Sequence, residues 1–213
     1  MKVSRFEVNP FGEMTYILWD DTTRSSVVVD PGMMYDDERN AIRDFIEKNG
    51  LSVKFVLITH IHVDHVASVG WLAKEYGAPV YCSNKDSELL KELPSQAARF
   101  HLRIDVGTFV PDRFISDGEE LLLNDEEIRV LETPGHSPGS LSFYLPQNEA
   151  VLTGDALFNG SIGRTDLPGG DFNQLISSIK DKILSLPPST LVLPGHGDVT
   201  TVEHEVKYNY FIR

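Results

Sequence analysis

Between Met1 and Asp30, hydrophobic and polar positions follow the period of β-strands. Two segments rich in Asn, Asp, Pro, Gly and Thr interrupt this alternation, which is typical of turns. The pattern predicts three strands in this part of the chain, at Lys2 to Val8, Thr15 to Trp19 and Ser26 to Val29.

From Tyr35 onward, helical and extended segments follow each other. Apolar residues at helical spacing predict a helix over Tyr35 to Asn49. Asp36 or Asp37 is expected to cap this helix, and Gly50 to end it. The next segments are predicted as a doubly buried strand at Val53 to Ile58, a helix at Ala67 to Tyr76, a strand at Pro79 to Cys82 and a helix at Asn84 to Leu93. Repeated units of this kind favour a partly parallel sheet with helices on its face.

The stretch from Pro94 to Asp117 lacks a clear period. Phe100, Leu102 and Ile104 alternate with polar residues, which suits an extended segment. A long, weakly patterned segment in a compact domain is often a loop near a binding site. We therefore expect a loop here.

Short strands resume beyond Asp117. They are predicted at Glu120 to Leu123, Ile128 to Glu132, Ser140 to Leu145, Glu149 to Leu152 and Thr190 to Leu193. Two segments resemble capping boxes that open helices, Asp171-Phe172-Asn173-Gln174 before a helix through Leu186, and Thr200-Thr201-Val202-Glu203 before a final helix.

Length and composition limit the class of protein. A chain of 213 residues, 41% of them hydrophobic, can bury a full core, and we expect a single domain over residues 1–213. No run approaches the roughly 20 apolar residues of a membrane span, and the start of the chain lacks a signal-peptide pattern. These features predict a cytoplasmic protein with no membrane partner. The one cysteine, Cys82, excludes an intrachain disulfide and lies in a short apolar run, which indicates a buried strand position outside the site.

The charge balance argues against a nucleic-acid partner. The chain has 19 basic and 32 acidic residues, a formal net charge of −13, and no basic cluster. Such a charge repels phosphate backbones. Bound divalent cations would offset part of it locally.

The run Thr59-His60-Ile61-His62-Val63-Asp64-His65 places four potential metal ligands directly after an apolar strand. Neutral imidazole and carboxylate are donors that Zn²⁺ and neighbouring first-row metals accept. Extended alternation would send His60 and His62 one way and place Asp64 and His65 further along, which suggests two adjacent metals. The alternative is a polar loop whose histidines cap a helix or make surface hydrogen bonds. Four donors in six residues favour the metal site.

Three further apolar strands end in the same way as the strand before His60. They lead into Thr133-Pro134-Gly135-His136, Thr153-Gly154-Asp155 and Pro194-Gly195-His196. Sites in sheets built from strand–helix units gather outside the carboxyl ends of the strands. We therefore expect these loops to form one site, in which each preceding glycine permits a sharp turn or a close approach.

Asp30, His101 and His204 lie outside these motifs. Asp30, at the end of the third strand, could cap the Pro31-Gly32 turn or orient the metal-binding loops, and both interpretations remain open. His101 and His204 lack a comparable setting and are interpreted as surface residues.

Taken together, these motifs resemble those of the metallo-β-lactamase-fold hydrolases. The resemblance rests on His60-x-His62-x-Asp64-His65, Thr133-Pro134-Gly135-His136-Ser137-Pro138-Gly139, Thr153-Gly154-Asp155 and Pro194-Gly195-His196-Gly197. Gly163-Arg164-Thr165-Asp166 is similar to the single-domain members of the glyoxalase II-like (hydroxyacylglutathione hydrolase-like) branch. Asp155 argues against true β-lactamases, which usually lack a bridging aspartate, and His62 against flavodiiron proteins, which carry Glu there.

The resemblance implies an α+β fold, a four-layer αβ/βα sandwich with two mixed sheets. It also implies two divalent metal ions, most often Zn, with Fe or Mn as alternatives. The first ion would be held by His60, His62 and His136, and the second by Asp64, His65 and His196. Asp155 would bridge the two ions. Asp64 and Asp155 would then be the catalytic carboxylates.

The leading functional hypothesis is an enzyme that hydrolyses a small-molecule thioester. A hydroxide that bridges the two metals would attack a substrate of the S-lactoylglutathione type. The alternatives are a hydrolase of another ester or thioester, a persulfide dioxygenase with one iron on His60, His136 and Asp155, and a non-catalytic metal-binding or partner-binding domain. The sequence sets no oligomeric state.

The substrate contacts are open. Glyoxalase II has an additional C-terminal helical domain that contacts glutathione, and this chain ends soon after His196. Either Arg164, Lys207 or the segment from Pro94 to Asp117 contacts glutathione instead, or the thioester is a different one. Arg164 is equally compatible with a structural salt bridge near the site.

Overall fold

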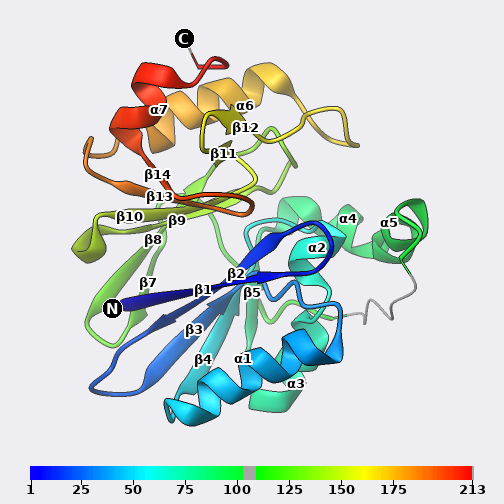
Figure 1. Cartoon of the computed structure of the whole chain (residues 1–213). Coiled ribbons are helices and arrows are strands. Elements are labelled where there is room, and N and C mark those ends of the chain that lie inside the picture. The colour runs from blue at the N-terminus through cyan, green and yellow to red at the C-terminus, as the bar shows by residue number, and fades with distance from the viewer. Residues whose placement is uncertain (103–108, 213) are drawn as a thin grey trace.

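Two six-stranded sheets pack face to face between outer helices in the computed structural model, which describes residues 1–102 and 109–212 (Figure 1). Helices α1 and α3 lie against the outer face of one sheet, and α6 and α7 against the outer face of the other. The predicted α+β fold, a four-layer αβ/βα sandwich with two mixed sheets, is confirmed.

The first sheet contains the predicted meander and the parallel strands that follow it. Its strands pair antiparallel from β1 to β3 and parallel from β3 to β6. In spatial order they are β1 (Lys2–Val8), β2 (Glu13–Trp19), β3 (Ser25–Val29), β4 (Ser52–Leu57), β5 (Val80–Cys82) and β6 (Arg113–Phe114).

The second sheet is built from the later part of the chain. Only β10 and β13 pair parallel within it. In spatial order its strands are β14 (Thr200–Thr201), β13 (Leu191–Pro194), β10 (Ala150–Gly154), β9 (Leu141–Leu145), β8 (Glu126–Glu132) and β7 (Glu120–Leu123), and a separate pair is formed by β11 (Leu157–Phe158) and β12 (Ser161–Ile162).

The helices are short apart from α1. They are α1 (Asp36–Lys48), α2 (Val63–Val66), α3 (Val69–Tyr76), α4 (Ser87–Lys91), α5 (Leu93–Arg99), α6 (Phe172–Ser178) and α7 (Val202–Tyr208), with 3₁₀ turns at Asn84–Asp86 and Pro146–Asn148 and a π-helical turn at Ile179–Ile183. No helix in the described ranges has the length and apolar character needed to cross a membrane.

Strand β2 shows how the layers are assembled. Its alternate residues Met14, Tyr16 and Leu18 pack between the two sheets, whereas Ile17 and Trp19 pack toward the helices. Because both faces are covered, the whole strand is buried and almost continuously apolar. Cys82 is also buried, in β5, as predicted.

The helix after the metal-binding motif begins earlier than predicted. We expected it to start at Ala67, but α2 begins at Val63, so Asp64 and His65 lie on helical backbone and not in an extended turn. The helical backbone is then interrupted before α3. At this point the Ser68 backbone N–H donates to Pro31 O at 2.9 Å, and the Ser68 hydroxyl donates to Met33 O at 2.5 Å. These tertiary bonds have no local signature in the sequence.

The segment predicted as a loop from Pro94 contains a helix and a strand. Pro94 lies in the first turn of α5, where its missing N–H costs nothing, and β6 lies at the edge of the first sheet. Phe100 is the C-cap of α5 and is not extended, since its N–H donates to Gln96 O at 3.2 Å. The predicted extended position of Ile104 lies outside the described residues.

Three helix ends differ in detail from the prediction. Tyr35, not Asp36 or Asp37, is the N-cap of α1. The Glu38 carboxylate accepts from the backbone N–H groups of Met34 and Tyr35. Thr201, not Thr200, caps α7, because Thr200 belongs to β14. Asp171 caps α6 as predicted, and the helix continues as the π turn, which ends at Ile183 and not at the predicted Leu186.

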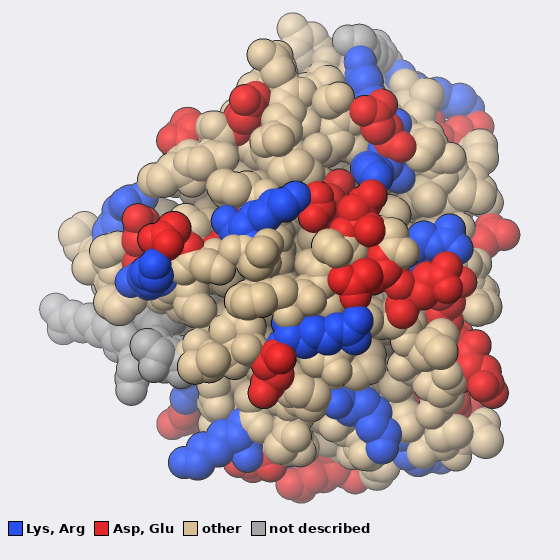
Figure 2. All heavy atoms as spheres, turned by 180° about the vertical axis from the view of Figure 1, so that it is seen from behind, with Lys and Arg blue, Asp and Glu red and all other residues tan. Residues whose placement is uncertain are grey.

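Charged side chains are mixed over the surface. On the face drawn in Figure 2, acidic groups lie between the basic ones, and this view shows no continuous basic area among the described residues. This is consistent with the net charge of −13.

Candidate metal centre

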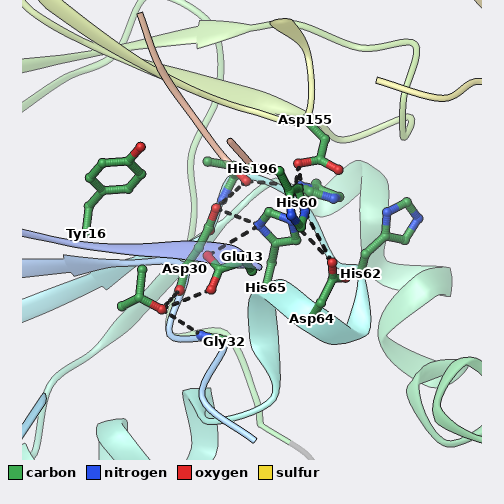
Figure 3. Close-up of polar contacts among 12 residues, drawn as sticks. Glu13, Tyr16, Asp30, Gly32, His60, His62, Asp64, His65, Asp155 and His196 are labelled. Carbon is green, nitrogen blue, oxygen red and sulfur yellow. Dashed lines mark hydrogen bonds and ion pairs between the residues drawn. The ribbon is translucent and has the colours of Figure 1, made fainter. Parts of the chain in front are cut away.

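Loops that follow four strands meet at one end of the sandwich. They carry His60 after β4, His136 after β8, Asp155 after β10 and His196 after β13. Asp155 projects from the second sheet toward the side chains of the β4 loop and α2 (Figure 3). The structure therefore brings together all seven residues predicted as metal ligands: His60, His62, Asp64, His65, His136, Asp155 and His196.

One group of donors consists of three imidazoles, His60, His62 and His136. Nδ1 of His62 lies 2.8 Å from Nε2 of His136, which lies 3.2 Å from Nε2 of His60. Nitrogens bound tetrahedrally to Zn²⁺ at about 2.0–2.1 Å are separated by roughly 3.3 Å. The spacing of these three nitrogens is thus close to that of ligands around one ion.

The second group consists of Asp64, His65 and His196. Oδ2 of Asp64 lies 3.3 Å from Nε2 of His196 and 3.8 Å from Nε2 of His65. His65 is fully buried, and the other two side chains are partly exposed toward the pocket. This group combines nitrogen and oxygen donors.

Asp155 lies between the two groups. Its Oδ2 is 3.4 Å from Nε2 of His136 in the first group, and its Oδ1 is 3.2 Å from His65 Nε2 and 3.6 Å from His196 Nε2 in the second. Gly195 permits this approach, because a Cβ at that position would lie 2.5 Å from Asp155 Oδ1. The position between the groups is the one expected of a bridging carboxylate.

The hydrogen bonds of the rings orient four of the five histidines. Each places Nδ1 against an oxygen that can accept a proton, namely Thr59 Oγ1 for His60 at 3.0 Å, Asp30 Oδ2 for His65 at 3.0 Å, Arg164 O for His136 at 2.7 Å and Phe11 O for His196 at 3.1 Å. The Thr59 hydroxyl accepts because its own proton is donated to Asp30 at 2.6 Å. In the neutral form of each ring Nδ1 therefore carries the hydrogen, and the Nε2 lone pair faces the centre, as a metal ligand requires.

The buried atoms at the centre fit a cation. His65 Nε2 and Asp155 Oδ1 face each other at 3.2 Å without forming a hydrogen bond. Both atoms are buried and lack a hydrogen-bond partner among the described residues. Buried polar atoms are rarely left in this state, and a cation between these two would satisfy both. The donor set suits Zn²⁺, Fe²⁺ or Mn²⁺.

The two groups differ in their protonation. Burial and the neighbouring imidazoles lower the pKa of His60 well below its ordinary value and lower the pKa of His62 to about 3. Burial alone would also lower the pKa of His65 and His196, but the carboxylates of Asp64 and Asp155 raise both above the ordinary value. His60 and His62 are thus neutral without a metal, whereas the second group holds protons that a metal must displace.

Asp30 acts on the loops in both of the ways considered. Its carboxylate accepts from the Thr59 N–H at 2.7 Å and from His65, while its carbonyl accepts from the Gly32 N–H at 2.8 Å across the turn. It therefore holds the turn through its backbone and orients a predicted metal ligand through its side chain.

Three residues that contact the site were not identified from the sequence. Glu13 is fully buried with Oε1 3.8 Å from His65 Nδ1, and burial raises the pKa of its carboxyl. Asp86 accepts from the Ile61 N–H at 3.1 Å, the Gly139 N–H at 2.6 Å and the Ser137 hydroxyl. The Tyr16 hydroxyl donates to Pro194 O at 2.7 Å. The only available signal was Glu13, a charged residue at the start of an apolar strand.

A cavity of about 270 Å³ opens onto the centre. Its walls include members of both donor groups, and apolar side chains such as Leu89, Phe100 and Leu167. Phe11 and Phe100 contact each other edge to face, with ring centroids 5.3 Å apart, and both line the cavity. The volume and the mixed lining are typical of a small-molecule site.

The two predicted substrate residues differ in position. Arg164 lines the cavity, and its guanidinium makes two 2.7 Å bonds to Asp166. It therefore lies where a substrate contact was predicted and also forms a salt bridge near the site. Lys207 is on α7 in an ion pair with Glu203 and is not part of the described cavity lining. His101 and His204 are exposed, as expected.

Comparison with known proteins identifies the family. The sequence model of the Metallo-beta-lactamase superfamily matches residues 8–196. One curated relative, hydroxyacylglutathione hydrolase GloC of Haemophilus influenzae, is 38% identical over 214 residues, which cover 100% of this chain and 98% of the relative.

Solved structures share the fold over nearly the whole chain. BLEG-1 B3 metallo-beta-lactamase is 32% identical with a TM-score of 0.90, and the alignment covers 99% of both chains. TTHA1623 in a di-iron-bound form is 36% identical with a TM-score of 0.86, over 98% of this chain and 99% of that one.

Proposed function

The chain belongs to the metallo-β-lactamase superfamily as a metallo-hydrolase, and we propose that it holds two divalent ions and hydrolyses thioesters of the hydroxyacylglutathione type. The observation that carries the proposal is the pair of donor groups on either side of Asp155, with members of both groups in the wall of one cavity. The full-length similarity to GloC supports the choice of substrate.

In this proposal His60, His62 and His136 hold one ion, Asp64, His65 and His196 hold the other, and Asp155 contacts both. Bound metal ions would supply Lewis acidity, which polarises a carbonyl and lowers the pKa of water from 15.7 toward about 7. The choice among zinc, iron and manganese is open, and the di-iron form of TTHA1623 makes iron a real alternative to zinc.

The chain's own groups orient the reactants. Asp64 lines the cavity, and although burial opposes its ionisation, the charge of His65 lowers the pKa of its carboxyl. Asp64 therefore stays ionised near neutral pH and can accept a hydrogen bond from the attacking water. Water adds to the thioester carbonyl, the C–S bond breaks, and the products are a carboxylate and a thiol. A thiolate is a good leaving group because the thiol pKa is only about 8.5, so no protein acid is needed at the sulfur.

Elemental analysis coupled to a substrate panel tests the proposal. The panel contains S-lactoylglutathione, other thioesters, simple esters and a β-lactam, which is included because of the similarity to BLEG-1. We expect about two metal ions per chain and a kcat/KM for S-lactoylglutathione above those for the esters and the β-lactam. Metal-replete protein that hydrolyses none of these compounds would point to a non-catalytic binding domain.

Persulfide dioxygenase activity is the second candidate, because His60, His136 and Asp155 also lie together. The His136 Nε2 atom is 3.2 Å from His60 Nε2 and 3.4 Å from Asp155 Oδ2, so these three could hold a single iron. The complete second donor group favours the dinuclear hydrolase. One iron per chain, with oxygen consumption on glutathione persulfide and no thioester hydrolysis, would reverse this preference.

A further inference from the structure

Helix α5 and its N-cap residue, Glu92, present two opposite charges to the cavity. Glu92, Gln96 and Arg99 are spaced i, i+4 and i+7, which places them on one face of a helix, and all three line the cavity. The backbone is helical from Glu92 onward, because the Gln96 N–H donates to Glu92 O at 2.8 Å. An acidic, an amide and a basic side chain therefore follow one another along the cavity wall.

The middle residue holds this face against the metal-binding loop. The buried amide of Gln96 accepts from the Val63 N–H at 3.0 Å and donates to Ile61 O at 3.2 Å. In the sequence, Ile61 and Val63 alternate with His60, His62 and Asp64. Gln96 thus fixes the position of α5 relative to the predicted metal ligands.

The side chains of the two outer residues, Glu92 and Arg99, have no charged or hydrogen-bonded partner among residues 1–102 and 109–212. The other arginine in the cavity wall, Arg164, is neutralised by its two bonds to Asp166. Arg99 is therefore the cation that can meet an anionic group of a substrate, and Glu92 is an anion that can meet an ammonium.

Building on the proposed thioester hydrolysis, we infer that Glu92 and Arg99 recognise the two charged ends of a peptidic thiol of the glutathione type. Seven helical residues separate the two side chains by about 10.5 Å along the axis. An extended α-linked tripeptide spans about 10 Å, and the γ-glutamyl linkage of glutathione adds two bonds to this length, so its ammonium can reach Glu92 while its C-terminal carboxylate reaches Arg99. The central cysteine then lies opposite Gln96, beside the metal-binding loop, where its thioester must be cleaved.

Binding of S-methylglutathione, which has no thioester to hydrolyse, tests the role of Arg99. Isothermal titration calorimetry of the metal-loaded full chain should show that Arg99→Gln raises Kd about tenfold or more, as expected for a lost charge-assisted bond. Lys91→Gln is the matched control, since it removes the same charge from an exposed residue outside the cavity lining. It should leave Kd within about twofold. Equal effects of the two variants would overturn the inference.

The ammonium contact is tested with a ligand that lacks the charge. Glu92→Gln should weaken binding of S-methylglutathione about tenfold but leave its N-acetylated derivative unaffected, because acetylation removes the ammonium. Glu88→Gln, an exposed residue of α4 outside the cavity lining, is the control. A loss of affinity for both ligands would show that Glu92 does not contact the ammonium.

Hydrolysis measured in parallel separates this inference from the proposed function. The wild-type chain should cleave S-lactoylglutathione with a higher kcat/KM than the lactoyl thioester of uncharged N-acetylcysteamine, and Arg99→Gln should reduce only the former. If the wild-type chain hydrolyses S-lactoylglutathione and Arg99→Gln leaves kcat/KM unchanged, the inference is wrong but the proposed function stands. Binding that depends on Arg99, with no hydrolysis of either thioester, would sink the proposed function alone.

Discussion

The two donor groups beside Asp155 lie in one cavity wall but differ in charge. His60, His62 and His136 form an all-imidazole group, in which burial lowers the pKa of His60 and His62. In the other group, the carboxylates of Asp64 and Asp155 raise the pKa of His65. Residues that are close in sequence therefore end in opposite electrostatic environments, and two ions bound here would differ in affinity and in proton release.

The groups also differ in the carboxylate that supports them. Asp86 accepts from the backbone N–H of Ile61 and of Gly139, so it supports the loops of the first group without touching a ring. Asp30 accepts directly from His65 in the second group. Asp86 thus supports the first group through backbone N–H groups, whereas Asp30 supports the second through a ligand side chain.

Replacing the shared residue should have the largest effect. Asp155→Ala removes the carboxylate that lies between the groups, so we expect metal affinity to fall more than about 100-fold, beyond the range for losing a hydrogen-bond partner of a ligand. Occupancy by two ions and turnover should both be lost, as measured by elemental analysis and S-lactoylglutathione hydrolysis. Asp44→Ala, an exposed residue of α1, is the control. Full activity with two ions in Asp155→Ala would refute the bridging role.

The sequence predicted this centre because the predicted ligands lie in short segments that directly follow apolar strands. His136, Asp155 and His196 come from widely separated parts of the chain, yet strand ends of an αβ/βα sandwich necessarily meet at one edge. The layers were predictable in part, since an almost continuously apolar strand such as Thr15 to Trp19 indicates burial on both faces.

Residues whose role depends on tertiary contacts were not predictable. Asp86 lies in a polar 3₁₀ turn that has no local mark of function, and it acquires one only because Ile61 and Gly139 fold onto it. Helix α5 was missed because Pro94 and its short length weaken the periodic signal. Its anchor, Gln96, contacts a loop more than thirty residues earlier in the chain.

Replacing the two supporting carboxylates should separate the groups. Asp30→Asn keeps the shape but weakens the acceptor of the His65 ring, so the affinity of the second ion should fall about 10- to 100-fold. The first ion should be affected less, because Asp30 reaches His60 only through Thr59. For Asp86→Asn, the affinity of the first ion should fall more than that of the second. Zinc titrations against a competing chelator measure both affinities, and an equal loss at both positions in either variant would contradict the comparison.

Lowering the pH should release the second ion before the first. We expect a smaller loss of metal affinity per pH unit than the substitutions cause. Protons compete with a metal below the pKa of each ring in the metal-free protein. That pKa is raised for His65 and His196, so competition begins above the ordinary histidine value of about 6.5, whereas for His62 it begins only near 3. Each competing proton lowers affinity about tenfold per pH unit. Protein equilibrated with a metal buffer at pH 8 should therefore hold two ions, and at pH 5 only one. Loss of both ions over the same pH range would show that the two groups do not differ in protonation.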